Sequence, residues 1–289
     1  MLAAEVMRIL APKAGESYVD MTAGYGGHAA MVLTATGNYE EAYLVDRDKN
    51  AQVVLSGLFS AQGCKLLHTD FLEASKNLVD EGKKFDVILA DLGVSSPHLD
   101  NKERGFSFKS PAPLDMRMDQ RAELTAAKIV NEYDETELAD IIYEYGEEPK
   151  SRLIARKIVE ARPIDDTANL AEVVASAYRG WSKRHPATKT FQALRIVVNN
   201  ELGLLSEALP LWLKLLSPGG RLAVITFHSL EDRIVKNAFK SVCEPGYESE
   251  FIDLTKHPIV ADKNELVSNP RARSAKLRAV VKIKTKERE

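Results

Sequence analysis

The residues best suited to chemistry follow a mostly apolar run at 85–90, in which Asp86 is the one polar residue. Asp91 comes directly after this run, and Gly93, Ser95 and Ser96 follow it. In open α/β sheets, ligands bind beyond the carboxyl ends of the strands, so an acid, a glycine turn and two hydroxyls here predict a catalytic site. Asp91, Ser95 and Ser96 are its candidate catalytic residues, although the two serines fit a simple turn cap equally well.

A second candidate site is the glycine-rich turn Gly24-Tyr25-Gly26-Gly27-His28, which also follows a short apolar run. With Ala29 it satisfies the G-x-G-x-x-A dinucleotide pattern, and Asp46 is placed to bind a ribose hydroxyl pair. Asp20, at the end of the preceding strand, would repel a pyrophosphate but suits an ammonium group. S-adenosylmethionine carries an ammonium and a ribose diol without phosphate, so the pattern favours this cofactor over a nicotinamide dinucleotide. The alternative is a tight strand-to-helix turn without a ligand.

Phe71 lies close behind the third predicted strand, 65–68. An aromatic ring at a strand end can flank the adenine of the cofactor, and it can equally well pack in the core. The sequence predicts the first role and leaves the second open.

The loop after Asp91 loosely resembles the Asp-Pro-Pro-aromatic loop by which amino-methyltransferases hold an exocyclic amine. Such an amine is a weak nucleophile, because its lone pair is delocalised into the ring. If the Asp91 carboxylate and the Leu92 carbonyl accept its two N–H bonds, the lone pair points at the methyl donor. Val94 stands where that loop has an aromatic residue. The stacking ring is therefore expected elsewhere: Phe106, Phe108 or Phe227.

The scaffold that positions these residues is predicted to be an α/β fold. Short apolar runs alternate with helical patterns, which is typical of a mostly parallel sheet covered on both faces. The expected strands are 17–21, 42–45, 65–68, 85–90 and 219–227, with 251–254 and 277–283 completing the sheet. The expected helices are 27–35, 49–61, 73–81 and 230–242, preceded by one at the N-terminus.

The stretch between the fourth and fifth strands is far longer than a crossover connection requires. It carries helical patterns at 124–130, 135–145, 151–160 and 170–178. We therefore expect two parts. Residues 1–103 and 200–289 would form the methyltransferase domain, and residues 104–199 an inserted all-helical domain that holds the substrate.

The composition fits a globular protein: 289 residues, 45% hydrophobic, 28% charged and a net charge of −3. Two cysteines without paired spacing, Cys64 and Cys243, exclude a Cys-based zinc site and fit a reduced cytoplasmic protein. No metal is expected. No run approaches the roughly 18 apolar residues of a membrane-spanning helix, so no membrane partner is expected either.

Charge is unevenly distributed along the chain. Residues 131–148 contain eight acids and no Lys or Arg, whereas residues 173–200 contain five basic residues and no acid. In the basic stretch, cations interleave with aromatic residues, which is typical of RNA binding; a plain amphipathic surface is the alternative. The cations are Arg179, Lys183, Arg184 and Lys189, and the aromatic residues are Tyr178, Trp181 and Phe191. Farther along, Arg271 and Arg273 would contact RNA or pair with the acidic block.

Taken in order, the motifs resemble those of the bacterial 16S rRNA cytosine-N4 methyltransferases, known as the RsmH or MraW family. The resemblance covers nearly the whole chain. It rests on Gly26-Gly27-His28, Asp46-Arg47-Asp48, and the segments 91–97, 104–108, 114–119, 185–188, 191–196, 227–233 and 269–274.

The resemblance implies a class I, Rossmann-like methyltransferase fold with S-adenosylmethionine as cofactor. It also implies methylation of the N4 of a cytidine in the decoding-centre P site of 16S rRNA, within the assembled small ribosomal subunit. The family's cofactor contacts fall here on Gly26, Gly27, His28, Asp46, Phe71, Asp91 and His98, the last of which replaces the usual Gln.

Three further features admit a structural interpretation. His228 follows the fifth predicted strand, where it could contact the base, accept the departing proton, or satisfy a loop carbonyl. The segment Glu231-Asp232-Arg233 begins a helix and is interpreted as structural. Arg117 fits a salt-bridged corner as well as a phosphate contact.

Two alternatives to an RNA methyltransferase remain at this stage. One is a nicotinamide-dependent oxidoreductase using the same glycine turn, which Asp20 disfavours. The other is a non-catalytic RNA-binding factor in ribosome assembly. The sequence leaves open whether the chain forms a homodimer.

Overall fold

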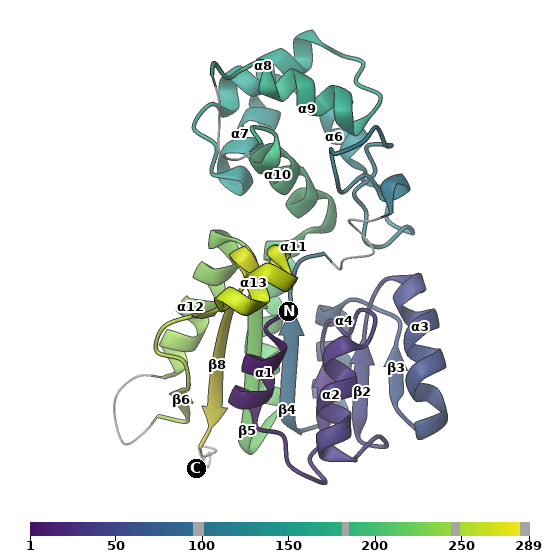
Figure 1. The fold of residues 1–289 in the computed structure, drawn as a ribbon, viewed down its shortest axis with the longest axis vertical. Coiled ribbons are helices and arrows are strands. Elements are labelled where there is room, and N and C mark those ends of the chain that lie inside the picture. Colours follow the sequence, from purple (N-terminus) through teal and green to yellow (C-terminus); the bar gives the residue numbers. More distant parts are fainter. Residues whose placement is uncertain (95–100, 181–184, 244–248, 284–289) are drawn as a thin grey trace. The chain divides into compact units, whose positions relative to one another are not determined.

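A computed structural model of the chain describes residues 1–94, 101–180, 185–243 and 249–283. The chain divides into two compact units, residues 1–93 with 202–289 and residues 94–201 (Figure 1). The sequence analysis placed these boundaries at 103/104 and 199/200. Some predicted site residues lie outside the described part: Ser95, Ser96, His98, Lys183 and Arg184.

The first unit is built on an eight-stranded sheet of order β3-β2-β1-β4-β5-β8-β6, with β7 also pairing with β8. Neighbouring strands from β3 to β5 are parallel, and β8 runs antiparallel to its partners. This mostly parallel sheet confirms the predicted α/β fold class. The strands are β1 Tyr18–Asp20, β2 Ala42–Val45, β3 Lys65–Leu67, β4 Phe85–Asp91, β5 Leu216–Thr226, β6 Phe251–Asp253, β7 Ile259–Val260 and β8 Lys276–Lys282.

Helices cover the sheet because its strands are apolar on both faces. Successive strand side chains point to opposite sides. Val87 and Leu89 therefore pack in one hydrophobic cluster, and Ile88 packs in the other. The helices of this unit are α1 Ala3–Leu10, α2 Gly27–Thr36, α3 Lys49–Phe59, α4 Phe71–Asp80, α11 Glu201–Leu215, α12 Ser229–Val242 and α13 Lys263–Ser268.

Side-chain caps set where several of these helices begin. The Asp48 carboxylate accepts the N–H of Asn50 at the start of α3, and Asp70 accepts those of Leu72 and Glu73 at the start of α4. Both caps follow directly on a strand and a short polar loop. The polar residues that follow these strands therefore have a structural role as helix caps, in addition to any role in ligand binding.

None of the helices in the described part of the chain combines the length and the apolar character needed to cross a bilayer. The helix α11 was not predicted from the sequence. It carries Pro210 in its interior, a residue that normally interrupts a helix.

The second unit is helical around its own core. Its helices are α6 Ala126–Glu132, α7 Glu135–Gly146, α8 Ser151–Glu160, α9 Thr167–Ala175 and α10 Thr188–Asn199. Leu138 and Ile142 of α7 pack in one hydrophobic cluster with Ile154 of α8 and Leu194 of α10. A Cβ at Gly146 would lie 2.8 Å from the Lys189 carbonyl oxygen, so glycine allows α7 to approach α10 closely.

Candidate active site at the carboxyl edge of the sheet

Three acids lie at the carboxyl edge of the sheet, on or just after three adjacent parallel strands. Asp20 ends β1, Asp46 directly follows β2, and Asp91 ends β4. The strand register aligns Asp20 with Leu44 on one side and with Leu89 on the other. The sequence predicted two half-sites separately: the glycine-rich turn after β1 and the loop after Asp91. The structure brings them together.

The turn after β1 has the backbone shape that its glycines predict. Gly24 and Gly26 have φ of 53° and 80°, a region that side chains disfavour. A Cβ at Gly26 would lie 2.7 Å from Cε2 of Phe59, whereas a Cβ at Gly27 would meet nothing within 4 Å. Gly26 is thus needed for the turn itself, and Gly27 leaves open space at the start of α2.

Asp46 links the loop after β2 to the glycine turn. Its Oδ2 accepts the Gly24 N–H at 2.8 Å, and its Oδ1 accepts the Asp48 N–H at 2.8 Å. A carboxylate oxygen has two lone pairs and can accept more than one hydrogen bond. The predicted contact to a ribose diol is compatible with this arrangement and stays a prediction.

Asp20 is a buried carboxylate, 1% exposed. It accepts hydrogen bonds from the Tyr18 hydroxyl at 2.8 Å and from the Thr22 N–H at 3.1 Å. Burial raises the pKa of Asp20 to about 6, against the opposing influence of His28 and these two donors, while the Asp91 charge adds to the rise. At neutral pH this is a largely ionised buried group, which suits the ammonium predicted to bind there.

Asp91 contacts both the glycine turn and the histidine beside it. Its N–H donates to Thr22 Oγ1 at 2.6 Å, and its Oδ2 lies 3.4 Å from His28 Nε2. The Asp91 Oδ1 and His28 Nδ1 atoms are both buried without a hydrogen-bond partner. Buried polar atoms are nearly always hydrogen-bonded, so this pair of atoms is a candidate position for polar groups of a ligand.

Phe227 lies against the turn that follows Asp91. Gly93 in that turn has φ of 89°, and a Cβ there would lie 3.2 Å from Phe227 Cδ2. Phe106 and Phe108 belong to the helical unit, where Phe106 is buried and Phe108 stacks on His185 with ring centres 4.6 Å apart. Within the first unit, Phe227 therefore lies beside the loop that follows Asp91.

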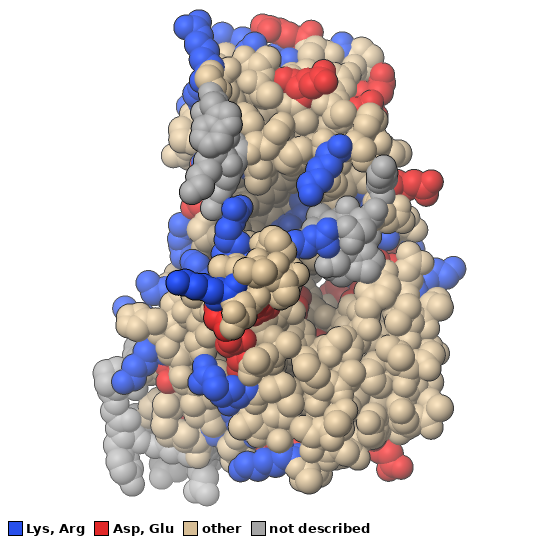
Figure 2. Space-filling model, in the orientation of Figure 1, with Lys and Arg blue, Asp and Glu red and all other residues tan. Residues whose placement is uncertain are grey.

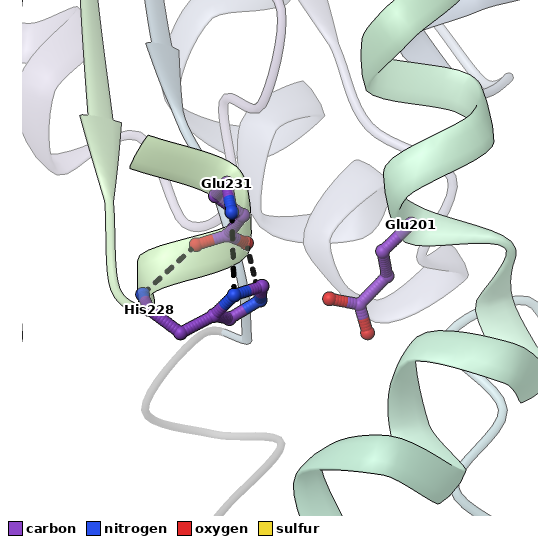
Figure 3. Close-up of side chains that lie close together, drawn as sticks. All are labelled: Glu201, His228 and Glu231. Atoms are coloured by element: carbon purple, nitrogen blue, oxygen red, sulfur yellow. Dashed lines mark hydrogen bonds and ion pairs between the residues drawn. The ribbon is translucent and has the colours of Figure 1, made fainter. Parts of the chain in front are cut away.

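His228 caps the start of α12. Its Nδ1 accepts the Glu231 N–H at 3.3 Å, and Glu231 Oε2 accepts the His228 N–H (Figure 3). Glu231 Oε2 also accepts the Phe227 N–H. An accepting Nδ1 places the proton of neutral imidazole on Nε2, which makes that atom a donor. The capping box therefore accounts for the position of His228, and its predicted catalytic role stays a prediction. Glu201, also labelled in Figure 3, is bound through both carboxylate oxygens by Arg195 at 2.8 Å.

Phe71 is the first residue of α4 and is partly buried. Its ring meets that of Trp212 edge-on, with centres 5.5 Å apart, and Trp212 Nε1 donates to Ser75 Oγ at 2.8 Å. The residue thus belongs in part to the core. Its predicted contact with adenine stays a prediction.

Two charged motifs have structural partners. Asp232 binds Arg278 at 2.7 Å and Lys276 at 3.1 Å. Burial opposes ionisation of Asp232, but these two cations hold its pKa below the usual range. The Arg117 guanidinium forms two hydrogen bonds with Asp115 and also donates to two backbone carbonyls, as a salt-bridged corner does.

The residues predicted to bind RNA differ in their surroundings. Arg179, Arg271 and Arg273 are exposed. Lys189 is exposed too, but its Nζ donates to the Glu147 carbonyl at 2.7 Å and so joins the start of α10 to the end of α7. On the face drawn in Figure 2, Lys and Arg side chains are scattered among uncharged residues and several acids.

The predicted interleaving of cations with stacking rings is wrong at one position. Phe191 is 5% exposed and packs edge-on against Phe108 in the core of the helical unit. Tyr178 is partly buried, and Lys150 Nζ lies 4.2 Å from the centre of its ring. The helical period of α10 turns Phe191 inward, away from the cations that neighbour it in sequence.

The sequence analysis gave no role to Tyr18 or Thr22, whose hydroxyls hold Asp20 and Asp91. Alternation along a strand is a usable signal for Tyr18, because residues i and i+2 share a face. No local pattern links Thr22 to Asp91, since the hydrogen bond between them crosses between strands.

Comparison with known proteins shows similarity along nearly the whole chain. Residues 1–283 match the family model described as the MraW methylase family. A Deinococcus radiodurans protein named Ribosomal RNA small subunit methyltransferase H is 50% identical over 287 residues, which cover 96% of this chain and 87% of the relative. Proteins of the same name from Synechococcus elongatus and Acidobacterium capsulatum are 46% and 45% identical, each over 98% of this chain and over 94% and 97% of their own lengths.

Proposed function

This chain belongs to the MraW methylase family, and from that premise we propose that it methylates a cytidine of small-subunit ribosomal RNA. The methylated atom is the exocyclic N4, and the cytidine is one in the decoding-centre P site. The observation that carries the proposal is the buried, unpartnered Oδ1 of Asp91 at the end of β4. An oxygen in this position can accept an N–H bond of a nucleobase amine.

The residues present fit the cofactor of the family, S-adenosylmethionine. Asp20 is a buried carboxylate whose negative charge a bound cation would stabilise, and Gly27 leaves space at the start of α2. His28 Nδ1 is a second buried atom without a partner. When bound, the cofactor supplies a methyl group activated by a sulfonium. The residues that would hold it are Asp20, Gly26, Gly27, His28, Asp46, Phe71, Asp91 and, outside the described part, His98.

The chain's own residues orient the acceptor amine. Asp91 Oδ1 accepts one N–H of the amine, and the Leu92 carbonyl accepts the other. The Leu92 N–H donates to the Ile225 carbonyl at 3.0 Å, which holds this loop on β5. With both N–H bonds engaged, the nitrogen lone pair points toward the methyl donor. Positioning supplies much of the rate, because the nitrogen becomes acidic only as the new C–N bond forms. The proton that it then loses passes to Asp91 Oδ1, which already accepts that N–H.

Recognition of the RNA is assigned to the inserted helical domain and to basic side chains on both units. The ring of Phe227 stacks on the target base beside Asp91. The assembled small subunit, in the cytoplasm, is the substrate. The cations that contact its RNA are Arg179, Lys183, Arg184, Lys189, Arg271 and Arg273.

Methyl transfer from labelled S-adenosylmethionine to small subunits tests the proposal, with the modified nucleotide mapped in the RNA. Subunits from cells lacking this protein and naked 16S rRNA serve as parallel substrates. Asp91→Asn should reduce transfer at least 100-fold, since loss of a positioned charged acceptor costs about 3 kcal/mol. The exposed Asp80→Asn is the matched control and should transfer normally.

A non-catalytic assembly factor is the alternative outcome. It would bind small subunits with equal affinity in the wild type and in Asp91→Asn, and would transfer no methyl group in either. Label on a nucleotide other than a P-site cytidine would overturn the assigned target while keeping the enzyme class.

A further inference from the structure

A tyrosine hydroxyl lies directly behind the carboxylate assigned to the cofactor. Tyr18 and Asp20 sit two residues apart on β1, on the same face of the strand. Both are buried, and the Tyr18 hydroxyl donates to Asp20 Oδ2 at 2.8 Å. The ring of Tyr18 packs in the hydrophobic core of the first unit, which fixes where its hydroxyl points.

The other groups that face Asp20 come from neighbouring elements. The Thr22 N–H donates to Asp20 Oδ1, the His28 imidazole lies on α2, and the Asp91 carboxylate lies on β4. Oδ2 of Asp20 therefore accepts a hydrogen bond from a residue of the same strand, and Oδ1 accepts one from the turn that follows. A buried carboxylate that loses a donor loses much of what stabilises its charge.

We propose that Tyr18 is a positioning residue for the methyl donor: its hydroxyl favours the charged form of the Asp20 carboxylate, and that carboxylate binds the cofactor ammonium. This inference rests on the proposed function, in which Asp20 binds that ammonium. Nothing in the family match or in the relatives' names assigns a role to Tyr18.

The Tyr18 hydroxyl can donate its hydrogen bond throughout the pH range of the experiment below, pH 6 to 8.5. Burial and the Asp20 charge raise the pKa of Tyr18 well above its usual value, so the hydroxyl keeps its proton. A hydrogen bond to the charged form of a carboxyl lowers its pKa. Removing the hydroxyl should therefore raise the pKa of Asp20 above about 6, toward neutral pH.

Tyr18→Phe removes the hydroxyl and keeps the ring. Dissociation constants for S-adenosylhomocysteine, which carries the same ammonium and ribose, are measured by calorimetry from pH 6 to 8.5. Titration of the ligand itself changes both dissociation constants by the same factor, so this effect cancels in the ratio of the variant constant to the wild-type constant. For a pKa rise of one to two units, this ratio should be about 3 to 25 at pH 6.5 and under about 1.5 at pH 8.5.

Two variants serve as controls. Tyr43→Phe makes the same change in a buried tyrosine on β2 and should give a ratio near 1 at every pH. Asp20→Asn should weaken binding at every pH and abolish the pH dependence that Asp20 supplies. In the wild type, the carboxyl carbon of Asp20 and the hydroxyl proton of Tyr18 should shift together in NMR spectra when ligand is added, a readout that requires no variant.

The outcomes separate this inference from the proposed function. A Tyr18→Phe ratio that is constant with pH, whether near 1 or raised, overturns the positioning role. An Asp20 signal that shifts on ligand addition without the Tyr18 hydroxyl also overturns it. If Asp20→Asn binds the ligand like the wild type, the assignment of Asp20 in the proposed function is wrong, and the inference falls with it.

Discussion

Thr22 Oγ1 accepts the backbone N–H of Asp91 at 2.6 Å, although the two residues are 69 positions apart in sequence. Thr22 belongs to the turn that follows β1, and Asp91 ends β4. The bond therefore ties the predicted cofactor turn to the predicted catalytic acid. Because Asp91 Oδ2 also meets His28, two contacts set the separation of the half-sites.

Thr22→Val should lower both stability and methyl transfer. Valine has the same shape but no acceptor, so the Asp91 N–H loses its partner at a cost of about 1–3 kcal/mol. Urea unfolding and single-turnover transfer rates measure the two effects. Thr22→Ser retains the hydroxyl and should stay close to the wild type. Equal rates in the valine variant and the wild type would show that this bond does not position Asp91.

Asp46→Ala should weaken cofactor binding by about 1.5–3 kcal/mol, or roughly 10- to 150-fold, through loss of a charged hydrogen bond to ribose. Titration calorimetry with S-adenosylhomocysteine measures this change. Asp86→Ala is the matched control, because Asp86 also accepts two hydrogen bonds, from the Ser17 N–H and hydroxyl, at the opposite end of the sheet. That variant should lose stability and keep its affinity. Unaltered affinity in Asp46→Ala would contradict the ribose assignment.

Asp20→Asn should stabilise the ligand-free protein at neutral pH. The pKa of Asp20 is raised to about 6 in the folded state, so its contribution to stability is present below about pH 4 and is lost as pH rises through 6. Above pH 6.5 the variant should exceed the wild type by about 1.5–3 kcal/mol in unfolding free energy. Urea unfolding at pH 4, 5, 6 and 7 provides the comparison. A stability difference that is the same at all four values would be inconsistent with a buried, titrating Asp20.

Neutralising Lys183, Arg184 and Lys189 together should weaken small-subunit binding and flatten its salt dependence. The slope should fall by roughly one for each RNA phosphate that no longer has a cation beside it. Because Lys189 is bonded to the Glu147 carbonyl, Lys189→Gln alone should mainly lower stability. Filter binding at several salt concentrations and thermal unfolding separate the two effects. If the triple variant loses stability but binds with the same salt slope, this face is structural.

Much of the fold could be predicted from local pattern. The strand at 42–45 and the helix at 151–160 have the predicted bounds, because each is a short apolar or amphipathic segment ended by polar residues. Local pattern was misleading where tertiary context overrides it. Pro210 lies within α11, and Phe191 is turned into a core although its neighbours in sequence are cations.

By itself, the sequence determined which chemical groups stand at the strand ends: the glycine turn and the three acids Asp20, Asp46 and Asp91. The tertiary structure alone decided which atoms of these groups meet. The bond from Asp91 to Thr22, the approach of Phe227 to Gly93 and the unpartnered Oδ1 of Asp91 all depend on strand register. Register is set by pairing between segments far apart in the chain, and no local period in the sequence encodes those pairings.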